Sequence, residues 1–127
     1  MLFWLCDVLN KISWDPDVDP ALREVCGRLA TDVDLSFLNR DECALWRAVE
    51  RLKEAAAEAH RASVAQYSLK EDGRLHEVVS AVLLQLALTL RYQVLEHATW
   101  SALDEPPADY LAARSARLPY HRYVARR

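Results

Sequence analysis

The segment Val78–Leu90 is the feature that most restricts what this chain can fold into. Only Ser80, Gln85 and Thr89 interrupt its run of apolar residues, and its flanks extend it without Gly or Pro. Leu, Ala and Gln favour helix, and a strand of this length would be unusual. The pattern predicts one helix over about 74–98, apolar on nearly all sides at its centre. We therefore expect the central helix of a bundle. The apolar run itself is too short and too interrupted to span a membrane.

The composition of the whole chain also favours helices. Gly occurs only twice, whereas β architectures rich in turns need many more turn residues. A length of 127 residues fits one domain that can bury a real core. With 52% hydrophobic and 28% charged residues, the composition is that of a globular protein. These features exclude a disordered chain.

Two helices are predicted in the N-terminal third, over residues 2–12 and 20–30. Apolar residues recur there at helical spacing, and Asp19 before Pro20 fits an N-cap followed by Pro at the first helical position. Residues 31–38 are interpreted as a connector that could hold a short helical turn. The residues expected to face the core are Leu2, Leu5, Cys6, Leu9 and Ile12 in the first helix, and Leu22, Val25, Cys26 and Leu29 in the second.

A long third helix is predicted over about 40–67. Asn39 and Glu42 have the spacing of a capping box at its start, and Asp72-Gly73 is a turn signal after its end. The residues expected to form its core stripe are Leu45, Val49, Leu52, Ala56, Ala59 and Ser63.

These elements predict an all-α fold. We expect a compact bundle of four to five helices with Leu45–Tyr67 and Leu75–Ala98 as a long central antiparallel pair. A short last helix is expected over Ala108–Ala116, with Pro119 as its stop. The helical bundle domain would comprise residues 1–112, followed by a basic C-terminal tail over residues 113–127.

The basic tail is the clearest electrostatic feature. From Leu111 onward there are five Arg and no acid, so this part carries +5, and because the whole chain carries −3, residues 1–110 carry −8. Arg binds phosphate in a bidentate fork, and Tyr stacks on bases. The candidate residues for binding nucleic acid or an acidic partner are Arg114, Arg117, Tyr120, Arg122, Tyr123, Arg126 and Arg127. The acidic body opposes broad contact with a nucleic-acid backbone. The tail could instead bind a protein partner, fold back onto the acidic helices of its own chain, or hang free.

The N-terminal helix is apolar on more than one face. Phe3, Trp4 and Val8 lie off its core stripe. This second face either completes the core or binds a protein partner or a second copy of the chain, since Phe and Trp are common interface residues. Several Asp residues follow closely, and they would be repelled by anionic lipid, so we expect no membrane contact.

Arg91 and His97 form an R-x5-H pair. This spacing resembles the R-x(4–6)-H motif of HEPN-domain ribonucleases, which are all-helical proteins of similar size. The resemblance implies metal-independent RNA cleavage, with Arg91 and His97 lining a site shared by two protomers. Tyr92 stands where that family commonly has a polar residue. On a regular helix, six residues separate two side chains by about 120°, so a common site needs a helix break or a second protomer.

No pattern for a metal or a cofactor is found. The four His residues are scattered, and neither Glu-x-x-His, H-E-x-x-H nor a glycine-rich phosphate loop occurs. The three Cys residues are odd in number and lack a C-x-x-C arrangement, which favours free thiols in a reducing compartment. We therefore expect a cytoplasmic protein without metal or cofactor.

The function that the sequence favours is that of a non-enzymatic interaction protein, a small helical subunit or adaptor of a larger assembly with a protein or ribonucleoprotein partner. The first alternative is a HEPN-like endoribonuclease that uses Arg91 and His97. The second is an immunity or inhibitor protein with an acidic surface.

Overall fold

The computed structural model describes residues 2–68 and 74–97, and this part of the chain is all-helical, as predicted. It contains four helices, α1 (Leu2–Trp14), α2 (Pro20–Leu38), α3 (Glu42–Ser68) and α4 (Arg74–His97). The predicted fifth helix, Ala108–Ala116, and the basic tail lie outside the described residues.

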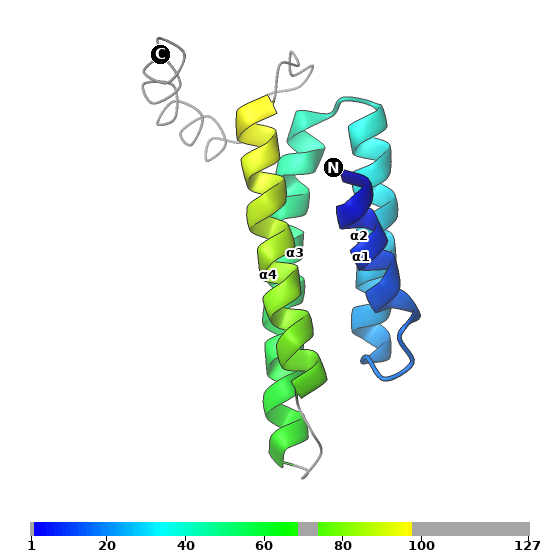
Figure 1. Ribbon diagram of the computed structural model, residues 1–127, viewed down its shortest axis with the longest axis vertical. Coiled ribbons are helices and arrows are strands. Elements are labelled where there is room, and N and C mark those ends of the chain that lie inside the picture. Colours follow the sequence, from blue (N-terminus) through cyan, green and yellow to red (C-terminus); the bar gives the residue numbers. More distant parts are fainter. Residues whose placement is uncertain (1, 69–73, 98–127) are drawn as a thin grey trace.

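The helices form two antiparallel hairpins, α1 with α2 and α3 with α4 (Figure 1). The hairpins join where α2 packs against α3, whereas α1 has only slight contact with α4. The core lies between the hairpins and within each of them. Its largest fully buried side chains include Leu9, Leu29, Leu52 and Leu83. The predicted core stripe of α3 is buried along its whole length, and in α2 only Val25, at 40% exposure, departs from the predicted inward set.

The predicted connector over residues 31–38 is wrong, because α2 continues through it to Leu38. Val33 is fully buried there, so tertiary packing supports the extra turns. The predicted cap of α3 is also wrong. Asn39 ends α2, and the N-cap role falls to Asp41, whose Oδ1 accepts a hydrogen bond from the Ala44 N–H at 3.0 Å.

A sharp reversal joins α2 to α3. The Asp41 N–H donates to the Ser36 carbonyl at 2.8 Å and the Arg40 N–H donates to the Phe37 carbonyl at 3.1 Å. This pair of bonds is a Schellman motif, which needs a left-handed residue just after the helix. Arg40 supplies it with φ 53°, and it is the only non-Gly residue of positive φ in the described chain. A side chain at such a position costs about 1 kcal/mol of stability relative to Gly.

The prediction that the fourth helix is enclosed on nearly all sides is wrong. Within the described residues α4 packs mainly on α3, so it buries one face, and its opposite face is open. Val78, Leu84, Leu88 and Tyr92 are each about half exposed, between 48% and 58%. The segment Arg74–Glu96 of this helix also contains an 18-residue window with a mean hydropathy of 1.6, so by length and composition it could cross a membrane. Core helices of soluble proteins meet the same criterion, and the expectation of no membrane contact stays a prediction.

The three Cys residues are free thiols, with Cys26 and Cys43 buried and Cys6 half-buried. Burial raises the pKa of the Cys26 thiol from 9.0 to about 11. Burial, and to a lesser degree the charge of Asp34, also raises the pKa of Cys6. Cys6 and Cys26 therefore act as small packed residues that resist ionisation.

Replacing Arg40 with Gly should raise the free energy of unfolding by about 0.5–1 kcal/mol, because Gly adopts the left-handed conformation without steric cost. Urea unfolding followed by circular dichroism measures the change. Arg40→Ala is the matched control, since it removes the side chain but keeps the strain. Equal stabilisation by Ala and Gly would contradict the backbone explanation.

The free energy of unfolding should fall as pH rises from about 9 to 11, because the unfolded chain releases the Cys26 proton at a lower pH than the folded chain. Below pH 9 this contribution is fully present. Urea unfolding at pH 8 and pH 10 should show a loss about 1 kcal/mol larger for the intact chain than for Cys26→Ala. Identical losses in the two proteins would argue against the raised pKa.

Candidate interaction surface

The open face of α4 carries a line of apolar side chains, which we call the α4 stripe: Val78, Ala81, Leu84, Leu88 and Tyr92. They recur every three or four residues, so they share one side of the helix. All five are exposed, while Leu83 and Leu86 on the opposite side are fully buried. None of the described helices covers this line. A contiguous exposed apolar line on a soluble domain commonly marks an interaction site.

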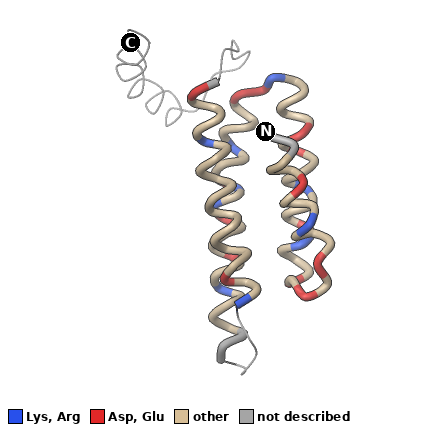
Figure 2. The backbone as a smooth tube through the Cα atoms, in the orientation of Figure 1, with Lys and Arg blue, Asp and Glu red and all other residues tan. Residues whose placement is uncertain are grey.

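Charged residues flank the α4 stripe but do not interrupt it. Figure 2 shows α4 without charge along its middle, and Arg74, Glu77 and Arg91 lie toward its two ends. The guanidinium of Arg91 lies over the ring of Trp46, with its Cζ 4.9 Å from the ring centroid. This cation–π contact anchors the side chain of Arg91 on the α3 side.

Sequence reasoning missed the α4 stripe, although one signal pointed to that side of α4. Gln85 is exposed on the same side of α4 as the stripe residues, and Thr89 is partly exposed beside them. The Thr89 hydroxyl donates to the Gln85 carbonyl at 2.9 Å, so its polar group is satisfied by the helix itself. These two polar residues mark which side of the apolar run faces outward.

The predicted partner-binding residues of α1 do not form one common exposed face. Trp4 is 52% exposed, whereas Val8 is half-buried and packs against the core. The side chain of Phe3 lies outside the described residues. Trp4 and Leu35 instead line a cleft of about 670 Å³ between α1 and α2.

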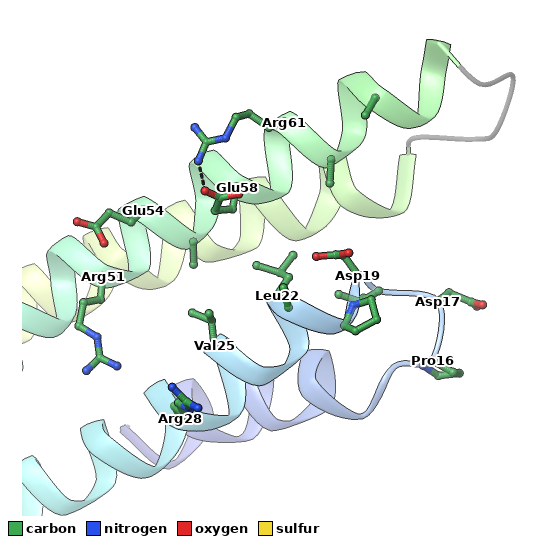
Figure 3. A pocket seen from close by; sticks show the side chains of 16 residues that line it. Pro16, Asp17, Asp19, Leu22, Val25, Arg28, Arg51, Glu54, Glu58 and Arg61 are labelled. Atoms are coloured by element: carbon green, nitrogen blue, oxygen red, sulfur yellow. Dashed lines mark hydrogen bonds and ion pairs between the residues drawn. The ribbon is translucent and has the colours of Figure 1, made fainter.

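A wider groove of about 1050 Å³ runs between α2 and α3. Leu22, Val25 and Ala55 contribute to its apolar floor. Figure 3 shows charged side chains on both walls, among them Arg61, which pairs with Glu58 along α3. Arg51 of the same wall pairs with Asp32 at 2.8 Å. The residues that line the groove include neither His nor Cys, which leaves it without the usual nucleophilic thiol or imidazole base.

The loop at the end of this groove is tied to α4 by a buried His. The Asp19 backbone N–H donates to Nε2 of His76 at 3.0 Å. His76 is only 1% exposed, and Asp19 is the N-cap of α2, without a side-chain capping bond of its own. The bond therefore links the first hairpin to the second and satisfies a donor at the start of α2.

Arg91 and His97 both belong to α4, which is unbroken between them. The helix break that a common site within one chain would need is therefore not found between these two residues. The side chain of His97 lies outside the described residues. The described residues contain no group of three or more His, Cys, Asp or Glu that could hold a metal ion.

The candidate binding residues of the tail lie outside the described residues: Arg114, Arg117, Tyr120, Arg122, Tyr123, Arg126 and Arg127. Binding through the tail stays a prediction.

Replacing His76 with Leu should lower the free energy of unfolding by about 1–3 kcal/mol, because the N–H of Asp19 loses its acceptor in a partly buried place. His76→Gln is the matched control, since its amide oxygen can still accept, and it should lose less. Urea unfolding measures both. If the Leu variant is as stable as the intact chain, the hydrogen bond is not what ties the loop to α4.

Comparison with known protein families, with curated proteins and with solved structures finds no match for this chain.

Proposed function

We propose that this chain is a non-enzymatic interaction protein, a small helical subunit or adaptor that binds a partner through the α4 stripe. The observation that carries the proposal is the exposure of Val78, Leu84, Leu88 and Tyr92 on one side of a helix whose other side is fully packed. Covering a half-exposed Leu contributes about 1 kcal/mol, so a few such residues supply a useful part of a binding energy.

The ion pairs of the groove and the position of Arg91 support a binding role. The charged groups of the α2–α3 groove include Arg51 and Arg61, each engaged in an ion pair with a neighbouring carboxylate. Arg91, the residue of the ribonuclease-like pair whose side chain is described, is stacked on Trp46. The free thiols fit a reducing compartment, so we place the protein in the cytoplasm.

The proposal separates the role of the stripe from the role of the tail. The stripe is uncharged along its middle, so it fits an apolar protein surface rather than a phosphate backbone. Nucleic-acid or acidic-partner binding, if present, would belong to the arginines of residues 113–127. An immunity or inhibitor role would instead use charged surface away from the stripe.

Leu88→Glu should reduce capture of the partner from a lysate of the source cell by tenfold or more, because an unpaired charge at an apolar interface costs roughly 2 kcal/mol. The intact chain is immobilised, and bound proteins are identified and quantified by mass spectrometry. Val64→Glu is the matched control: Val64 is 56% exposed and lies on α3 rather than on α4. Equal capture by the intact chain and both variants would contradict the proposal.

A further inference from the structure

The flanking charges of the α4 stripe suggest what covers it. Glu77, Leu84 and Arg91 follow one another at intervals of seven residues, and they form one edge of the stripe. Leu84 is midway between a negative and a positive residue. Seven residues are close to two helical turns, so all three lie on nearly the same line along the helix.

The stripe residues, together with Gln85, also recur at intervals of seven. Val78, Gln85 and Tyr92 form one such series, and Ala81 and Leu88 form a second. Two interleaved series of this kind are typical of a helix that packs along another helix over several turns. From Val78 to Tyr92 the line is about 21 Å long at 1.5 Å per residue.

We infer that the α4 stripe binds the α4 stripe of a second copy of this chain, with the two helices antiparallel and Leu84 opposite Leu84. This inference rests on the proposed function, since it names the partner of the same surface. A two-fold axis through this contact makes the interface identical on both copies, as in most homodimers.

The antiparallel register makes the charges complementary. Glu77 and Arg91 are equally far from Leu84 in opposite directions, so Glu77 of each copy meets Arg91 of the other. The register is thus supported by two ion pairs. In a parallel pair the same edges of the two helices lie on opposite sides of the interface, so Glu77 of one copy would not reach Arg91 of the other. Arg91 keeps its contact with Trp46, because a stacked guanidinium still donates hydrogen bonds in its own plane.

The same register matches the sizes of the apolar groups. Val78 of one copy packs against Leu88 of the second copy, and the small Ala81 lies opposite the longer Gln85. A polar residue at one layer of a helix pair helps to specify register at some cost in stability. All of these side chains are already exposed in the single chain, so pairing needs no rearrangement of the core.

The mass of the intact chain in solution tests the inference directly. Light scattering after size-exclusion chromatography should give twice the chain mass of 14.5 kDa at micromolar concentration. Leu84→Glu should give a monomer that keeps its helical circular dichroism, because it places two carboxylates at the two-fold axis. Val64→Glu should remain a dimer. A monomeric intact chain, or a dimer that survives Leu84→Glu, overturns the inference.

Charge reversal tests the register. Glu77→Arg should weaken the dimer about tenfold, because the new arginine of each copy then faces Arg91 of the other copy. Adding Arg91→Glu should restore the affinity. A double variant that is as weak as the single one, while still folded by circular dichroism, overturns the antiparallel pairing.

Crosslinking provides an independent check of orientation. Val78→Cys chains mixed with Leu88→Cys chains should form disulfides under mild oxidation, and neither variant alone should form a disulfide-linked dimer. The intact chain is the control for linkage through the three natural thiols. Self-linking of either variant overturns the antiparallel arrangement.

Flotation with phosphatidylcholine vesicles tests a lipid surface as the occupant. If the intact chain is a monomer that floats with the vesicles and Leu84→Glu does not float, the stripe binds lipid and the inference of a second copy is overturned. If the intact chain is monomeric but Leu88→Glu still loses a protein partner, self-association fails and the proposed function stands.

Discussion

The packing of α4 on α3 is the contact on which the rest of the structure depends. Small residues of α3, Ala56 and Ala59 among them, are buried, and so are large residues of α4 such as Leu83 and Leu86, in the core to which both helices contribute. Small groups on one helix let the other approach closely. The Ser80 hydroxyl donates to the Ala56 carbonyl at 2.7 Å, and this bond fixes how the two helices are aligned. Because the alignment sets which side of α4 is covered, it also sets which side is exposed.

The first hairpin completes the core from only one direction. α2 packs on α3, while α1 packs on α2 and has slight contact with α4. At the start of α2, the hydrogen bond between Asp19 and His76 links the first hairpin to α4. The outcome is a fold with one well-filled interior and one helix that keeps an apolar side open. An exposed apolar face of that kind commonly marks an interaction site.

The candidate site could be predicted from the sequence only in part. The apolar run and its polar interruptions were visible, and two of these interruptions, Gln85 and Thr89, lie on the exposed side of α4 in the structure. The individual stripe residues were not predicted, because a run that is apolar all round gives no helical periodicity from which a buried side can be chosen. For α1 the sequence showed a second apolar face beside the core stripe. In the structure, Val8 of that second face packs against the core.

The sequence by itself determined the helical class and the buried stripe of α3, because apolar residues at helical spacing and a shortage of Gly leave few alternatives. It also determined the start of α2, through Asp19 and Pro20. Tertiary structure decided that α2 extends to Leu38, that Asp41 rather than Asn39 caps α3, and that α4 has an open side. These features depend on contacts between residues far apart in the chain, and local propensity is too weak to choose among them.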